Sequence, residues 1–194
     1  MMFMYARMDS IHPAAGLCAR AVVLKGLSGM ALSDPTSASS GVSMARILRP
    51  RAIAIVGASA DPRSFGGFVQ GNLERYGYSG ELHLVSRSSS EINGHACVKT
   101  IDELPEGLDL AVLAIPEAGV LDAVQSLAAR QCHAAVLFAS GYAEAGEEGQ
   151  AKQVELARVA REAGIALVGP NCMGLIVPHH RLALCSSVVL DTQS

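Results

Sequence analysis

The chain has 194 residues, of which half are hydrophobic and 17% are charged, and its formal net charge is −3. This length and apolar content suffice for one globular domain with a buried core, together with a tail. The slightly acidic balance argues against a nucleic-acid partner, whose binding needs a basic face. No apolar stretch approaches the roughly 18–20 residues of a membrane-spanning helix, so we expect no membrane partner.

The cysteines predict reduced thiols. Five are present, at Cys18, Cys97, Cys132, Cys172 and Cys185, an odd number at wide spacing. They form no CxxC pair and no cysteine–histidine cluster with the spacing of zinc ligands. We therefore expect a cytoplasmic protein with no metal site.

Residues 1–43 differ in composition from the rest of the chain. They show no clear apolar period and end in a Ser/Gly/Pro/Thr-rich stretch that is typical of linkers. We expect a disordered N-terminal extension. Two alternatives stay open: a transit peptide, favoured by Arg7, Arg20 and Lys25, or a start codon assigned too early, with the domain opening at Met44.

From Arg51 onward, apolar runs typical of buried strands alternate with amphipathic stretches typical of helices. The predicted strands are 52–56, 80–85, 110–115, 133–140 and 165–169, and the predicted helices are 68–76, 120–128 and 147–164. Strands interleaved with helices of this length imply right-handed crossovers. The sequence therefore predicts an α/β fold with a doubly wound, Rossmann-like parallel sheet and helices on both faces.

In such a sheet, ligands bind at the carboxyl ends of the strands, near the point where the strand order reverses. The first of these loops reads VGASADPRSFGG and contains Gly57, Ser64, Gly66 and Gly67. Small residues let a phosphate approach the backbone, and the helix that starts there offers unpaired N–H groups. The spacing is not the G-x-G-x-x-G of dinucleotide-binding loops. We predict a phosphate-binding turn; the alternative is that the glycines serve only a tight turn and close helix packing.

Two further loops favour a phosphorylated nucleotide. The second strand ends in Ser86, Arg87 and Ser88, whereas an NAD site usually places Asp or Glu there. A basic residue among hydroxyls suits the phosphorylated ribose of NADP or coenzyme A, with a solvated polar loop as the alternative. After the third strand, Pro116 leaves a flat apolar surface on which an adenine ring could pack.

The loop after the fifth strand, GPNCMG, has an unusual composition. Pro170 fixes a backbone angle, Asn171 tolerates a strained turn, and Gly174 allows the chain to reverse. Cys172 is a possible nucleophile, but no histidine is tied to it by the sequence. A structural thiol is the favoured interpretation.

Within residues 47 to about 178, three segments follow one another in order: LRPRAIAIVGAS, SGYAEAGEEG and GPNCMGLIVP. Their order and spacing resemble the CoA-binding domain of NDP-forming acyl-CoA synthetases, the family that includes the succinyl-CoA synthetase α subunit. The resemblance implies a coenzyme A site within a domain at 44–178. In the family, the first loop cradles the CoA phosphates, which corresponds here to Ser64, Phe65, Gly66 and Gly67.

The same resemblance implies roles for the other loops. Arg87 would contact the phosphorylated ribose, and Ala114, Ile115 and Pro116 would border the adenine. Asn171, in the GPNCMG loop, would lie near the thiol end of CoA. Relatives commonly have Asn-Pro where this chain has Ser86-Arg87, so the detail of ribose recognition differs.

In the family, a flavodoxin-like domain follows and carries a histidine that is phosphorylated during catalysis. An ATP-grasp domain or subunit phosphorylates it, so ATP/ADP or GTP/GDP would bind outside this chain. We expect residues 179–194 to begin a linker toward such a domain. His179 and His180 lie in that stretch and are not expected to be the phosphorylated histidine.

The resemblance implies a CoA-binding domain of an acyl-CoA synthetase, which converts acid, CoA and NTP into acyl-CoA, NDP and phosphate. The chain would be inactive by itself, and no catalytic residue is assigned to it. One alternative is a stand-alone, non-catalytic module that senses CoA or acyl-CoA. Another is an NADP-dependent oxidoreductase domain, which the absence of G-x-G-x-x-G disfavours.

Overall fold

A computed structural model describes residues 43–188, so the expected extension at 1–43 lies outside the described residues except for Ser43. The described part begins with a short helix, α1 (Met44–Leu48), and contains three longer α-helices: α2 (Phe65–Tyr76), α3 (Val120–Ala129) and α4 (Glu147–Glu162). The main sheet contains β1 (Ala52–Val56), β2 (Glu81–Val85), β3 (Glu91–Ile92), β4 (His95–Val98), β5 (Leu110–Leu113), β6 (Ala134–Leu137) and β7 (Ala166–Val168). A hairpin of β8 (Gly174–Val177) and β9 (Leu182–Cys185) forms a second sheet.

The main sheet has the strand order β3-β4-β2-β1-β5-β6-β7. All neighbouring strands run parallel except β3, which pairs antiparallel with β4 at one edge. The order reverses at β1, because the chain builds outward on one side through β2 and then returns to add β5 on the other. The predicted doubly wound α/β sheet is confirmed, and its switch point lies between β1 and β5.

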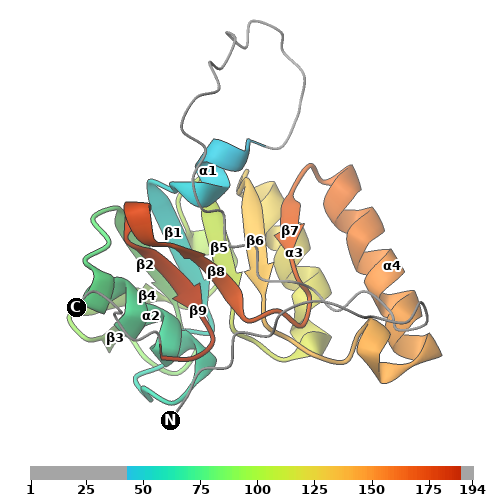
Figure 1. The fold of residues 1–194 in the computed structure, drawn as a ribbon, viewed down its shortest axis with the longest axis horizontal. Helices are drawn as coiled ribbons and strands as arrows, with labels where there is room; N and C mark the ends of the chain where they lie inside the picture. Colours follow the sequence, from blue (N-terminus) through green and yellow to red (C-terminus); the bar gives the residue numbers. More distant parts are fainter. Residues whose placement is uncertain (1–42, 189–194) are drawn as a thin grey trace, which may run out of the picture.

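Both faces of the sheet are covered (Figure 1). Since side chains alternate along a strand, β1 contributes Ile53 and Ile55 to one core and Ala54 and Val56 to the other. On the first face, α2 and the β8–β9 hairpin complete the core with Val69, Leu73, Leu182 and Leu184. On the second face, α3 and α4 complete it with Val120, Val124, Leu127, Leu156 and Ala160.

The small hairpin β3–β4 was not predicted from the sequence. Its strands have two and four residues, too few for an alternating pattern to identify them. Asn93 and Gly94 make the turn, both with positive φ, as two-residue hairpins require. Because β4 runs parallel to β2, its carboxyl end adds Lys99 to the same edge of the sheet as the loop after β2.

Strand β9 lies in the stretch that was expected to be a linker. All four of its residues are buried, and it packs on α2. The Asn72 side chain, on α2, donates hydrogen bonds to the carbonyls of Cys185 (3.3 Å) and Ser187 (2.8 Å). The boundary expected after residue 178 therefore falls inside a hairpin that belongs to this fold. A four-residue apolar run is too short for its period to reveal that.

Within residues 43–188, no helix is long and apolar enough to cross a membrane. The same part of the chain contains no group of three or more His, Cys, Asp or Glu side chains placed to hold a metal ion.

Candidate functional site

Three strands meet where the strand order reverses. Gly57 ends β1 with φ +88°, and the N–H groups of Gly57 and Ala58 both donate to the carbonyl of Val85 at 3.1 and 3.0 Å. A Cβ at Gly57 would collide with the carbonyl oxygen of Ala114, just after β5. The turn thus needs glycine both for its backbone angle and for its contact with β5. The carboxyl ends of β1, β2 and β5 are held together as a result.

Ser64 caps the helix that follows this turn. Its Oγ donates to the carbonyl of Asp61 at 2.7 Å and accepts from the amide of Gly67 at 3.0 Å. This cap makes α2 begin at Phe65, three residues earlier than predicted. Among residues 43–188, no acceptor bonds the amides of Phe65 and Gly66. The first turn of α2 therefore offers two N–H groups to an anionic group.

Phe65 itself joins this turn to the end of β6. Its ring packs edge-to-face on Phe138, with the ring centroids 5.8 Å apart and the planes at 68°. Phe138 is buried, whereas half of Phe65 stays exposed. An exposed aromatic side chain therefore stands beside the two amides.

Gly66 and Gly67 have packing roles. A Cβ at Gly66 would collide with the carbonyl oxygen of Gly57, and one at Gly67 with the carbonyl oxygen of Asp61. These contacts support the alternative given above, that glycines here permit close helix packing. They place α2 directly against the turn, which fixes the position of the two unpaired amides.

Two substitutions in α2 separate packing from helix propensity. Gly66→Ala should lower the free energy of unfolding by about 1 kcal/mol, because a clash of about 1–3 kcal/mol exceeds the gain in helix propensity. Gly71→Ala, in the same helix with nothing within 4 Å of the added Cβ, should raise it by about 0.5–1 kcal/mol. Urea denaturation of both variants measures the difference. Equal stabilisation by the two changes would contradict the packing role of Gly66.

A cavity of about 570 Å³ opens at the same edge. It brings together three of the predicted site residues, Arg87, Ile115 and Pro116. Ser64, Phe65, Gly66, Gly67, Ala114 and Asn171 are not among its lining residues. The other side chains around it come from the ends of β1 and β2, the segment after β4, the segment before α3 and the first two turns of α3: Val56, Val85, Lys99, Thr100, Ile101, Asp102, Ala118, Asp122, Ala123 and Ser126.

Two basic side chains, Arg87 and Lys99, line this cavity. The buried hydroxyl of Ser86 accepts from the amide of Ser89 at 3.3 Å and shapes the turn from which Arg87 extends into solvent. Lys99 donates to the carbonyl of Ser89 at 2.8 Å, so it lies against the same turn. Sequence reasoning missed Lys99 because it missed β4. The sequence feature that could have indicated Lys99 is its position directly after a short apolar run, Ala96–Val98.

The GPNCMG loop is tied to the loop after β6. Asn171 has φ +49°, and its amide donates to the carbonyl of Ala139 at 3.0 Å. Glu144 accepts from the amides of Gly141 (2.6 Å) and Tyr142 (3.2 Å) in the loop after β6. Desolvation acts to raise the pKa of Glu144, but hydrogen bonds, chiefly from backbone amides, outweigh it and hold the pKa below its ordinary value. The carboxylate thus orders the loop after β6, and the backbone hydrogen bond of Asn171 ties the GPNCMG loop to it.

Cys172 has the environment of a structural thiol. Its Sγ donates to the carbonyls of Leu137 at 3.3 Å and Val168 at 3.5 Å. Burial raises the pKa of this thiol, which favours the neutral form over the nucleophilic thiolate. His179 and His180 line a different cavity, at the opposite edge of the sheet.

Known proteins contain a domain similar to this one. A family model described as a CoA binding domain matches residues 51–178. The chain is 44% identical over 129 residues to a trans-feruloyl-CoA synthase of an unknown prokaryotic organism, covering 66% of this chain and 18% of that protein. It is 35% identical over 133 residues to an ADP-forming acetate–CoA ligase I of Archaeoglobus fulgidus, covering 69% and 19%. It thus spans about a fifth of the length of these curated relatives.

Solved structures share the fold. The dinucleotide-forming acetyl-coenzyme A synthetase 1 of Ca. Korarchaeum cryptofilum, in complex with phosphate and ADP, matches with a TM-score of 0.71 and 30% identity over 75% of this chain and 31% of its own. A shorter chain from Thermus thermophilus matches with a TM-score of 0.52 and 26% identity over 69% of this chain and 91% of its own. By the match over residues 51–178, this chain belongs to the CoA-binding domain family and is related to the NDP-forming acyl-CoA synthetases.

Proposed function

We propose that this chain binds coenzyme A at the carboxyl edge of its sheet, as the CoA-binding domain of an NDP-forming acyl-CoA synthetase. The observation that carries the proposal is the cavity at the switch point. In a chain of this family, it combines the basic Arg87 with the apolar Ile115 and Pro116.

The residues around the cavity fit the parts of CoA. Arg87 and Lys99 approach from neighbouring strands and would bind the 3′-phosphate on the ribose by charge-assisted hydrogen bonds. Ile115 and Pro116 would pack against the adenine ring. The free amides of Phe65 and Gly66, at the positive end of α2, would bind the diphosphate.

The thiol end of CoA would extend toward the loops after β6 and β7. There the amide of Asn171 is bonded to the carbonyl of Ala139, which fixes the loop against which the pantetheine chain would lie. CoA supplies the nucleophilic sulfur in acyl transfer. The role of this chain in that step is to bind CoA and orient it.

The complete reaction would convert acid, CoA and NTP into acyl-CoA, NDP and phosphate. This chain aligns with about a fifth of the synthetase relatives, so the remaining chemistry belongs to other domains in our proposal. A phosphorylated histidine on a second domain would carry the phosphoryl group, and an ATP-grasp domain or subunit would bind ATP/ADP or GTP/GDP.

Calorimetric titration of the 194-residue chain with CoA, dephospho-CoA and NADP tests the proposal. CoA should bind about tenfold more tightly than dephospho-CoA, because the 3′-phosphate gains at least one charge-assisted contact. NADP should bind more weakly than CoA. The absence of CoA binding at millimolar concentrations, or tighter binding of NADP, would overturn it.

A second candidate function is a stand-alone CoA or acyl-CoA binding module. The observation that favours it is the Thermus thermophilus chain, 91% of which is covered by the match to this chain. The DNA sequence downstream of residue 194 discriminates the two functions. A reading frame that continues into the remaining synthetase domains supports the first, and a stop codon with no such domains nearby supports the second.

A further inference from the structure

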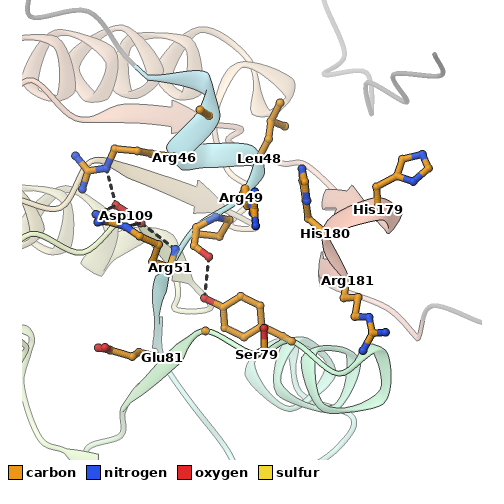
Figure 2. A pocket seen from close by; sticks show the side chains of 14 residues that line it. Arg46, Leu48, Arg49, Arg51, Ser79, Glu81, Asp109, His179, His180 and Arg181 are labelled. Carbon is orange, nitrogen blue, oxygen red and sulfur yellow. Dashed lines mark hydrogen bonds and ion pairs between the residues drawn. The ribbon is translucent and has the colours of Figure 1, made fainter. Parts of the chain in front are cut away.

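A second, larger cavity lies at the opposite edge of the sheet from the proposed CoA site. Its volume is about 1110 Å³. Its walls come from α1, from the residues just before β1 and β2, and from the turn between β8 and β9 (Figure 2). Four arginines and two histidines line it, against only two carboxylates, although the whole chain carries a formal charge of −3. The positive charge is therefore concentrated here.

One of the two carboxylates is already neutralised. Asp109 is buried and accepts hydrogen bonds from Arg46 Nε at 2.5 Å and from Arg51 Nε at 2.9 Å. The other, Glu81, is exposed at the start of β2. The structural ion pairs of Asp109 thus involve Arg46 and Arg51 and leave Arg49 and Arg181 available for an external anion.

Arg49 and Arg181 are the remaining basic side chains of the cavity that always carry charge. Within residues 43–188, no ion pair joins Arg49 or Arg181 to a carboxylate. Arg49, just after α1, and His180, in the β8–β9 turn, both line the cavity and lie in the middle of the view in Figure 2. His179 points away from them, and Arg181 extends toward the end of α2 at Gly77. Arg49 and His180 are therefore the groups that we take to bind the ligand.

The wall between them is apolar. Leu48, Pro50 and Tyr78 line the cavity, and the Tyr78 hydroxyl donates to the carbonyl of Pro50 at 3.2 Å. Burial, with Asp109 and Glu81 nearby, raises the pKa of Tyr78 to about 12, so this hydroxyl keeps its proton at neutral pH. Tyr78 therefore contributes an uncharged side chain to the cavity, anchored at its hydroxyl to Pro50.

We propose that this cavity binds an organic phosphate with more than one phosphate group, such as a nucleoside diphosphate, through Arg49 and His180. A guanidinium fork matches two phosphate oxygens, and an imidazole N–H adds a further donor. The apolar wall suits the organic part of the ligand. The volume is at the upper end of small-molecule sites, which favours a nucleotide-sized ligand over a single phosphate ion. This site is separate from the proposed CoA site and does not depend on it.

Titration of the full chain with ADP and with inorganic triphosphate tests the proposal. Both should bind, and the double variant Arg49→Ala/His180→Ala should weaken ADP by at least about tenfold through the loss of charge-assisted contacts. His179→Ala is the matched control, an adjacent exposed histidine that points away, and should retain the affinity. The three substituted positions, 49, 179 and 180, are exposed, and thermal unfolding checks that the variants stay folded.

Titration of ADP in the presence of saturating CoA distinguishes this site from the CoA pocket, and ADP should bind with unchanged affinity. Displacement of ADP by CoA would place the nucleotide in the other cavity and overturn the proposal. Equal weakening by His179→Ala and by the double variant would also overturn it, as would no binding of either probe at millimolar concentrations. Tighter binding of a glutamate-rich peptide than of ADP would assign the cavity to an acidic protein segment instead.

Discussion

Asp109→Asn should lower the free energy of unfolding by about 2–4 kcal/mol at neutral pH. The carboxylate is 1% exposed and joins three parts of the chain, because it accepts from Arg46 on α1 and from both the amide and the guanidinium of Arg51 before β1. Removal of one member of a buried ion pair costs about 3–5 kcal/mol. We expect a loss at or below the lower end of that range, since the Arg51 side chain is 81% exposed and can be hydrated again. Urea denaturation at neutral pH measures the loss.

The difference in the free energy of unfolding between the wild type and Asp109→Asn should depend on pH. Burial acts to raise the pKa of Asp109, but the hydrogen bonds from Arg51 and Arg46 outweigh it and place the pKa well below its ordinary value. A depressed pKa stabilises the fold above the unfolded value of about 4 and stabilises it less as the pH falls below that. The wild-type advantage should therefore be constant from neutral pH down to about pH 5 and should shrink below about pH 4.

Glu106→Gln is the control for this prediction. Glu106 pairs with Arg130 at 3.2 Å, but 57% of its side chain is exposed. An exposed pair contributes about 0–1 kcal/mol, so this variant should lose much less stability. If Asp109→Asn lost no more than Glu106→Gln, the network around Asp109 would not anchor α1 and β1 as we argue.

The sheet could be predicted from the sequence because its strands are buried on both faces. Ala52–Val56 and Leu110–Leu113 are continuous apolar runs bounded by turn residues. Where such short runs alternate with amphipathic helices along a chain, they are typical of buried parallel strands. The ends of the strands were predicted less accurately. The strand predicted at 133–140 extends only from Ala134 to Leu137, because the apolar residues continue beyond the last hydrogen bonds between the strands.

The elements that were missed owe their position to tertiary contacts. Strand β9 exists because it pairs with β8 and packs on α2, and neither partner is visible in a four-residue apolar run. The Asp109 network joins residues 46, 51 and 109, which no local pattern connects. Lys99 came to the candidate site through β4, an edge strand too short to predict.

The structure places only some of the predicted site residues in one cavity. Arg87, Ile115 and Pro116 share one cavity, as expected if each follows a parallel strand near the switch point. The residues from Ser64 to Gly67 lie outside that cavity, and their glycines contact backbone carbonyls of their own loop. Sequence can indicate that a loop needs glycine, but whether the space faces a ligand or a carbonyl depends on how the helix packs.

Arg87→Ala should weaken CoA about 10-fold or more and leave dephospho-CoA nearly unchanged. Arg87 is exposed at the rim of the cavity, on a turn that the Ser86 hydroxyl holds, so its loss should not disturb the fold. In our proposal its guanidinium binds the 3′-phosphate, and such a contact contributes about 1.5–3 kcal/mol. Calorimetric titration of both ligands into both proteins gives the four affinities of a double cycle.

The interaction free energy from this cycle isolates the contact between Arg87 and the 3′-phosphate from general effects of charge. Arg158→Ala is the matched control: it removes an arginine that is bound to Glu155 and Glu162 on the outer surface of α4, and both affinities should stay unchanged. Equal weakening of CoA and dephospho-CoA by Arg87→Ala would remove Arg87 from ribose-phosphate recognition. Lys99, the other cation of the cavity, would then be the group to carry it, because it lies against the same turn from the neighbouring strand.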